Sequence, residues 1–279
     1  MDQITVTSRD GVELAMRQAG HGDIGLVFIH GFNQCHLAWT RQLADPALNA
    51  ACRMAAFDLR GHGASAKPSR PEAYTDAALW AADVAAVIAA TGFRKPILVG
   101  WSYAGRVITD YIREHGTSAL GGIVFVGALL KADGRMMGRG RRHFAPMLSA
   151  DLATNIDGTR GFLRACFERE PARDDFETML AYNMVVPPVV RKHLLDRSGD
   201  PADVLGAIGC PVLLAHGGKD QVILAETSRF AVTQIPNAQL SIYDACGHSP
   251  FYEDATRFNA ELLAFANSVH QATRDAAPT

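Results

Sequence analysis

The chain has 279 residues with 27 Lys and Arg against 29 Asp and Glu, a formal net charge of -2, and 48% of its residues are hydrophobic. This composition excludes an intrinsically disordered chain and lacks the basic field that nucleic-acid binding needs. The longest uncharged apolar run, 119–130, has 12 residues with three glycines and is too short to span a bilayer. We therefore expect no nucleic-acid partner and no membrane span.

The five cysteines are scattered and include no Cys-x-x-Cys pair. This pattern is typical of free thiols in a reducing compartment rather than of a disulfide framework. The N-terminal segment lacks a cationic, apolar signal region. We expect a cytoplasmic protein, and nothing in the sequence indicates its oligomeric state.

The first predicted element is a hairpin of two strands, residues 4–7 and 12–17, joined by a turn that contains Asp10-Gly11. Short runs of apolar residues without alternation then recur along the chain, as expected for strands buried on both faces of a parallel sheet. These runs are 25–30, 54–57, 96–99, 123–126, 211–215 and 239–243.

Predicted helices separate many of these strands, at 75–91, 103–115 and 254–267, and Thr75 or Asp76 can cap the first of them. Alternation of strand and helix indicates an α/β fold with a doubly wound, mostly parallel, eight-stranded sheet.

Residues 130–208 break the alternation, because they contain no convincing buried strand but several helical segments rich in methionine and aromatic residues. An unstructured loop of that length would be unusual, so an inserted helical cap is expected. We divide the chain into a core of residues 1–129 and 209–270, the cap at 130–208 and a frayed tail at 271–279.

A serine lies on the turn between a predicted strand and helix, where residues 100–105 read Gly-Trp-Ser-Tyr-Ala-Gly. Such a turn strains the backbone of the serine and raises its hydroxyl above the sheet, and small residues around it allow helix and strand to approach. The helix N-terminus adds a positive dipole end beside the hydroxyl. Ser102 is therefore a candidate nucleophile.

Two backbone amides are candidates for an oxyanion hole. One is the amide of Phe32, because Gly31 permits an unusual backbone angle that would direct this amide into a site. The other is the amide of Tyr103, directly after the serine.

An acid and a base follow the last two predicted strands, so that the chain order is Ser102, Asp220, His248. A serine hydroxyl needs a base near neutral pH, and an imidazole can accept its proton while an acid orients the ring. The C-terminal ends of the strands in an open α/β sheet are where ligands bind, so these residues are expected to meet there.

Together these segments resemble the α/β-hydrolase fold superfamily over nearly the full length of the chain. The serine turn, His30-Gly31-Phe32, Gly-His-Ser-Pro-Phe at 247–251 and Asp-Leu-Arg-Gly-His-Gly-Ala-Ser at 58–65 all match its patterns, although Ala104 replaces the usual final glycine of G-x-S-x-G. The resemblance implies a scaffold role for 58–65. It implies Ser102 as nucleophile, His248 as base, Asp220 as acid, and the amides of Phe32 and Tyr103 as oxyanion donors.

Asp133 is the alternative acid, since some relatives carry the acid after the strand that corresponds to 123–126. Haloalkane dehalogenases and epoxide hydrolases resemble this fold but have aspartate where Ser102 stands, so their chemistry is not expected here.

The motifs are most similar to those of small esterases, metal-free perhydrolases and acyl-homoserine lactonases. The resemblance implies a serine hydrolase that cleaves carboxylic esters or lactones with small to medium apolar acyl groups, through an acyl-enzyme on Ser102. The alternatives are a low-turnover ligand receptor or regulator, and a cofactor-free perhydrolase or lyase. No metal cluster or dinucleotide fingerprint occurs in the sequence, so neither a metal nor a cofactor is expected.

The substrate pocket is expected to be apolar and adaptable, because methionine and aromatic side chains surround the predicted site. No acidic or basic residue can be assigned beside that site from the sequence, so charged acyl groups are expected to be poor substrates. The predicted lining is Phe32, Asn33, Trp101, Tyr103, Met136, Phe144 and Met184.

Overall fold

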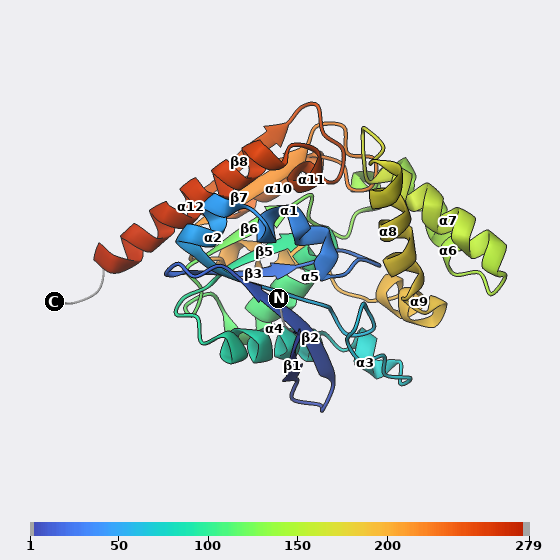
Figure 1. Ribbon diagram of the computed structural model, residues 1–279, viewed down its shortest axis with the longest axis horizontal. Helices are drawn as coiled ribbons and strands as arrows, with labels where there is room; N and C mark the ends of the chain where they lie inside the picture. The colour runs from blue at the N-terminus through green and yellow to red at the C-terminus, as the bar shows by residue number, and fades with distance from the viewer. Residues whose placement is uncertain (1–2, 276–279) are drawn as a thin grey trace.

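The computed structural model describes residues 3–275 and is built around one eight-stranded sheet (Figure 1). The strand order is β1-β2-β4-β3-β5-β6-β7-β8; β2 pairs antiparallel with β1 and β4, and all other pairs are parallel. The predicted doubly wound, mostly parallel sheet is confirmed. The strands are β1 (Gln3–Thr7), β2 (Glu13–Ala19), β3 (Ile24–Ile29), β4 (Cys52–Phe57), β5 (Ile97–Trp101), β6 (Gly122–Val126), β7 (Val212–Gly217) and β8 (Ala238–Tyr243).

Two apolar cores lie on opposite faces of this sheet. Along β3, Leu26 and Phe28 belong to one core, whereas Val27 and Ile29 belong to the other. Successive side chains of a strand point to opposite faces, so a strand whose two faces are both buried has an unbroken run of apolar residues in the sequence. This explains the apolar runs in the sequence.

Helices cover both faces of the sheet (Figure 1). Residues of α4 and α5 contribute to one core, and residues of α12 contribute to the other. The helices of the two faces are α1 (Thr40–Leu43), α2 (Pro46–Ala51), α3 (Glu72–Thr75), α4 (Ala77–Thr91), α5 (Ala104–His115), α10 (Glu226–Gln234), α11 (Pro250–Glu253) and α12 (Ala255–Asp275).

Local signals define the ends of α4. The carboxylate of Asp76 accepts a hydrogen bond from the amide of Ala78, and Gly92 ends the helix in the left-handed conformation at φ 64°. Of the two caps considered from the sequence, Asp76 is therefore the one used.

The helix α12 continues to Asp275, so the expectation of a frayed tail is wrong for residues 271–275; residues 276–279 lie outside the described part. Local side-chain bonds accompany this last turn: Thr273 Oγ1 donates to the carbonyl of Val269, and Gln271 Nε2 donates to Asp275. No helix among residues 3–275 combines the length and the apolar character that crossing a membrane requires.

Between β6 and β7 the chain is helical, and none of the eight strands comes from it. Its helices are α6 (Phe144–Met147), α7 (Leu152–Ala165), α8 (Arg173–Met184) and α9 (Pro188–Leu195). Figure 1 shows them gathered at one end of the molecule, in yellow-green to gold.

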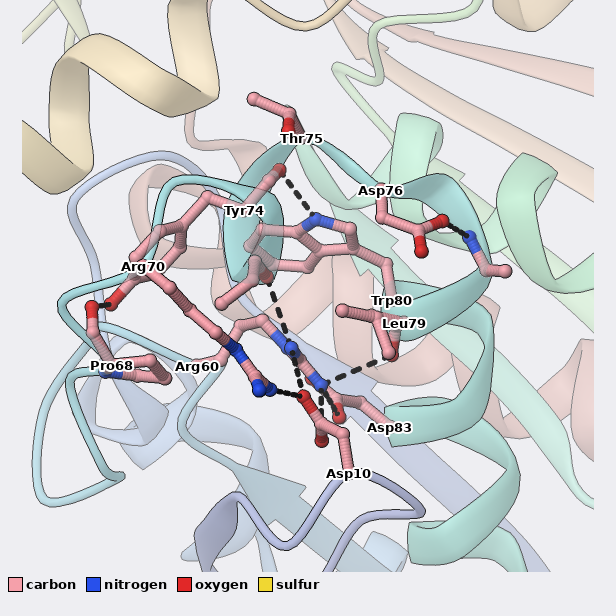
Figure 2. A network of polar contacts seen from close by, with 12 residues as sticks. Asp10, Arg60, Pro68, Arg70, Tyr74, Thr75, Asp76, Leu79, Trp80 and Asp83 are labelled. Carbon is pink, nitrogen blue, oxygen red and sulfur yellow. Dashed lines mark hydrogen bonds and ion pairs between the residues drawn. The ribbon is translucent and has the colours of Figure 1, made fainter.

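The turn after β4 is fixed by a buried ion-pair network (Figure 2). Arg60 is unexposed and donates from Nε and Nη2 to both oxygens of Asp83 on α4, each at 2.6 Å. Its Nη1 donates to Asp10 of the β1–β2 turn at 3.1 Å. The network therefore joins the first hairpin, the turn and α4, which agrees with a scaffold role for residues 58–65.

Candidate active site

Ser102 lies in the turn between β5 and α5 and has a left-handed backbone conformation, with φ at 58°. This conformation is strained for a residue other than glycine, so contacts with the surrounding structure must stabilise it. The amide of Ser102 donates to the carbonyl of Val126 at 2.9 Å, and its carbonyl accepts from the amide of Leu129 at 2.9 Å. These bonds fix the strained turn at the C-terminal end of the sheet, as the sequence predicts.

Gly31 is needed at this site for close approach rather than for an unusual backbone angle. Its φ is not positive; the left-handed residue of the loop is Asn33, with φ at 63°. A Cβ at position 31 would lie 3.0 Å from the Cβ of Ser102 and 3.3 Å from the carbonyl oxygen of Trp101. The expectation about the angle of Gly31 is therefore wrong, and the glycine instead lets the β3 loop lie against the serine.

Asp220 and His248 form a fully buried pair, with His248 Nδ1 2.6 Å from Asp220 Oδ2. The other carboxylate oxygen accepts from the amides of Val222 and Ile223, at 2.7 and 3.0 Å. Burial by itself would raise the pKa of Asp220, but His248 and His216 outweigh burial and hold that pKa well below its usual range. Asp220 is therefore an ionised hydrogen-bond acceptor.

The hydrogen bond to Asp220 determines how His248 is protonated. Because a carboxylate only accepts, Nδ1 carries the proton, and in the neutral ring Nε2 is left as an acceptor. Nε2 is buried and makes no hydrogen bond to any residue in the described part of the chain. Trp101, the neighbour of Ser102, donates from Nε1 to the carbonyl of His248 at 2.9 Å. The ring of His248 is thus held beside the serine turn with one nitrogen ready to accept a proton.

Asp133, the alternative acid, is engaged elsewhere. The guanidinium of Arg135 lies 2.7 Å from its carboxylate, and the amide of Arg135 also donates to it. These hydrogen bonds lower the pKa of Asp133 to about 2. Within residues 3–275 no ion pair joins Asp133 to His248, whereas Asp220 forms one.

The amides of Phe32 and Tyr103 both lie outside regular helices and strands, next to Gly31 and Ser102. Within residues 3–275 neither amide donates a hydrogen bond to another residue. Buried backbone amides are nearly always paired, so two unpaired amides beside a strained serine are suited to an oxyanion.

A cavity of about 290 Å³ opens onto Ser102. Phe32, Tyr103 and Phe144 line it as expected, but Asn33, Trp101, Met136 and Met184 do not. Trp101 instead packs behind the site against His248 and Phe251. The apolar part of the observed lining is Phe32, Tyr103, Leu129, Met137, Phe144, Phe162, Leu194, Leu195, Val222 and Ile223.

A family model described as the alpha/beta hydrolase family matches residues 26–261. The chain belongs to this family. The match includes all of Ser102, Asp220 and His248.

Relatives of this α/β hydrolase include both peroxidases and esterases by name. A non-heme chloroperoxidase, CPO-A1 of Kitasatospora aureofaciens, is 30% identical, covering 94% of this chain and 98% of the relative. A bifunctional esterase/perhydrolase of Acinetobacter calcoaceticus is 26% identical, covering 94% of this chain and 99% of the relative. The crystal structure of the esterase RhEst1 from Rhodococcus sp. ECU1013 is 34% identical with a TM-score of 0.88, covering 96% of this chain and all of that one.

The hydrolase site contains a second buried histidine that the sequence did not identify. His216 Nε2 lies 3.1 Å from Asp220 Oδ2, the oxygen that also contacts His248, and 2.9 Å from the carbonyl oxygen of Ile223. Its Nδ1 is 2.7 Å from the hydroxyl of Ser228. The only signal in the sequence was its place at the end of a predicted strand, which a structural histidine shares.

Charged residues also line the cavity of the hydrolase, although the sequence allowed none to be assigned beside the site and an apolar lining was expected. They are Arg106, Lys131, Asp133 and Arg197. Arg106 belongs to α5, and Arg197 lies just after α9, so helices before and after β6 each position a guanidinium.

Outside the catalytic site, Cys35, His36 and Asp58 place their possible ligand atoms within 4.8 Å of one another. Both oxygens of Asp58 are already hydrogen-bonded: Oδ1 to the amide and the ring of His36, at 2.7 and 2.8 Å, and Oδ2 to the amide of Ala64 at 2.8 Å. These bonds account for the cluster as part of the scaffold of the turn.

Proposed function

We propose that this protein hydrolyses carboxylic esters through an acyl-enzyme on Ser102, with His248 as the base and Asp220 as the acid. The observation that carries the proposal is the buried Asp220–His248 bond of 2.6 Å, which leaves Nε2 of His248 without a partner beside a strained serine. A histidine that is oriented by an acid and available to a serine is the arrangement of a serine hydrolase.

In the first half of the reaction the Ser102 oxygen attacks the ester carbonyl carbon while its proton passes to Nε2 of His248. The carbonyl oxygen becomes an oxyanion and accepts hydrogen bonds from the amides of Phe32 and Tyr103. The ester C–O bond then breaks, and the leaving alcohol takes the proton from Nε2. In the second half, water loses a proton to Nε2 and attacks the acyl carbon, which releases the acid and restores the serine hydroxyl.

The acyl group would bind in the cavity beside Ser102, between the core and residues 130–208, which we assign as a cap. Its aromatic and aliphatic lining is suited to small and medium chains. Each fully buried methylene contributes about 0.8 kcal/mol, or roughly fourfold in kcat/KM. We expect kcat/KM to rise from acetyl toward longer acyl groups and to level off when the cavity is full. Lactones present the same carbonyl chemistry and belong in the same screen.

Perhydrolysis is a second candidate, favoured by the names of relatives that cover nearly the whole chain. Hydrogen peroxide would replace water in the second half, so that its oxygen bonds to the acyl carbon and a peracid leaves. Formation of peracid from an ester and peroxide, measured against hydrolysis by the same preparation, tests this activity.

The test of the hydrolase proposal combines labelling with turnover. An organophosphonate should add once per chain, at Ser102, and Ser102→Ala should abolish hydrolysis of a simple aryl ester without unfolding the protein. Multiple turnovers would exclude a ligand receptor. Labelling at another serine, or an active Ser102→Ala variant, would contradict the proposal.

A further inference from the structure

The charged residues of the active-site cavity differ in whether they have a partner. Arg197 Nη2 lies 2.5 Å from Asp110, and Lys131 lies 3.1 Å from Asp200. Asp133 is paired with Arg135, as described above. Arg106 forms no ion pair with any carboxylate among residues 3–275.

Arg106 is nevertheless buried, with 8% of its surface exposed. Its Nη2 donates to the carbonyls of Ser198 and Gly199, which are neutral groups, while Nε and Nη1 donate to no residue in the described chain. The nearest acid on the same helix, Asp110, already binds Arg197 and Arg113. One guanidinium on the cavity wall therefore makes no direct ion pair within residues 3–275.

The two buried arginines of the cavity show the consequence of this difference. Burial opposes the charge of both. At Arg197, contact with Tyr103 and Asp110 outweighs burial and raises the pKa, whereas at Arg106 burial prevails and the pKa is lowered. An arginine keeps its charge at neutral pH, an unpaired buried charge is costly, and the guanidinium fork matches a carboxylate, so a bound anion would stabilise Arg106.

We propose that Arg106 binds a carboxylate carried by the ester substrate, so that the preferred substrates are anionic esters with an apolar body. Arg106 lies in the first turn of α5, four residues after Ser102 in the chain, and lines the same cavity as Ser102. Apolar side chains of the same cavity, such as Phe144 and Phe162, would contact the body of the substrate. The inference rests on the proposed esterase activity and reverses the expectation that charged acyl groups are poor substrates.

The carboxylate could belong to the acyl or to the alcohol part of the ester, and two sets of matched substrate pairs separate these cases. For the acyl part, monoethyl esters of succinic, glutaric and adipic acid are compared with the ethyl esters in which the free carboxylate is replaced by a carboxamide. For the alcohol part, 4-acetoxybenzoate is compared with 4-acetoxybenzamide. Each pair has nearly the same size and differs in charge.

Charge-assisted hydrogen bonds are stronger than neutral ones, so we expect kcat/KM for the carboxylate to exceed that for the amide by about tenfold in at least one pair. Arg106→Gln should remove this preference. Arg113→Gln makes the same substitution on the same helix but outside the cavity, and it should keep the preference. A preference that is absent, or that persists in Arg106→Gln, would overturn the inference while leaving the esterase proposal intact.

If the protein turned over no ester, that result would count against the proposed function but not against a carboxylate site at Arg106. A binding measurement tests the carboxylate site independently of turnover. Titration calorimetry compares glutarate with glutaramide as ligands. The wild-type protein should bind glutarate at least tenfold more tightly than glutaramide, and Arg106→Gln should not. Equal binding of the two ligands by the wild type would refute a carboxylate site at Arg106.

Discussion

Replacing Asp220 with asparagine should inactivate the enzyme through the tautomer of His248. In the structure Asp220 Oδ1 accepts from the amides of Val222 and Ile223, so the carbonyl oxygen of an asparagine would take that place. Its amide NH2 would then face Nδ1 of His248 where Oδ2 now lies at 2.6 Å. A donor at that place requires Nδ1 to be an acceptor, so the ring proton moves to Nε2.

A His248 protonated on Nε2 cannot accept the proton of Ser102. The loss of the orienting anion and the wrong tautomer together should lower kcat by about 10⁴, equivalent to about 5.5 kcal/mol in the activation free energy. The substitution keeps the shape of the side chain and both backbone hydrogen bonds, so the fold should be retained.

The assay is steady-state hydrolysis of an aryl ester, with circular dichroism to verify folding and phosphonate labelling to count active serines. Asp133→Asn is the matched control, because Asp133 also lines the cavity but is bound to Arg135. Its kcat should stay within a few-fold of the wild-type value. If Asp220→Asn retained kcat within about tenfold, or if Asp133→Asn were the more damaging substitution, the assignment of the acid would be refuted.

Three further predictions follow from particular contacts. Gly31→Ala should lower kcat by about 10²-fold with little change in stability, because the added Cβ would lie 3.0 Å from the Cβ of Ser102 and displace its hydroxyl. Steady-state kinetics measure the first effect and urea unfolding the second, and an unchanged kcat would contradict the prediction. Arg60→Met should cost about 3–5 kcal/mol of unfolding free energy because it leaves Asp83 buried without its cation, whereas Arg60→Met combined with Asp83→Leu should recover most of it; equal losses in both variants would contradict this account. Burial lowers the pKa of His62 to about 3, and its Nε2 has no partner within residues 3–275, so the folded state resists a proton that the unfolded chain accepts below about 6.5. The free energy of unfolding should therefore fall as pH decreases from 6.5 toward 4, by at most about 1.4 kcal/mol per pH unit for this group. Urea denaturation measured at several pH values tests this: if His62→Gln has the same dependence of unfolding free energy on pH as the wild type, His62 is not the group responsible.

Sequence alone determined the architecture of this protein and the order of its proposed catalytic groups. Apolar runs, helix caps and the strand–turn–helix setting of Ser102 are local properties, because side-chain alternation and backbone preference act over a few residues. The positions of Asp220 and His248 after the last two strands followed from the same local reading. Parallel strands end at one edge of the sheet, so residues after those ends are brought together by the architecture itself.

The character of the cavity was decided by tertiary structure. In the sequence Arg106 is one more charged residue on a helix, and only the structure shows that it is buried, donates to backbone carbonyls and makes no ion pair within residues 3–275. Met137 rather than Met136 lines the cavity, and its backbone forms an antiparallel bridge with Ile223, another lining residue that is far along the chain. Gly31 is likewise required by the proximity of Ser102 rather than by its own dihedral angles. Such contacts join segments that are distant in sequence, and no local pattern encodes which of several similar side chains will face the substrate.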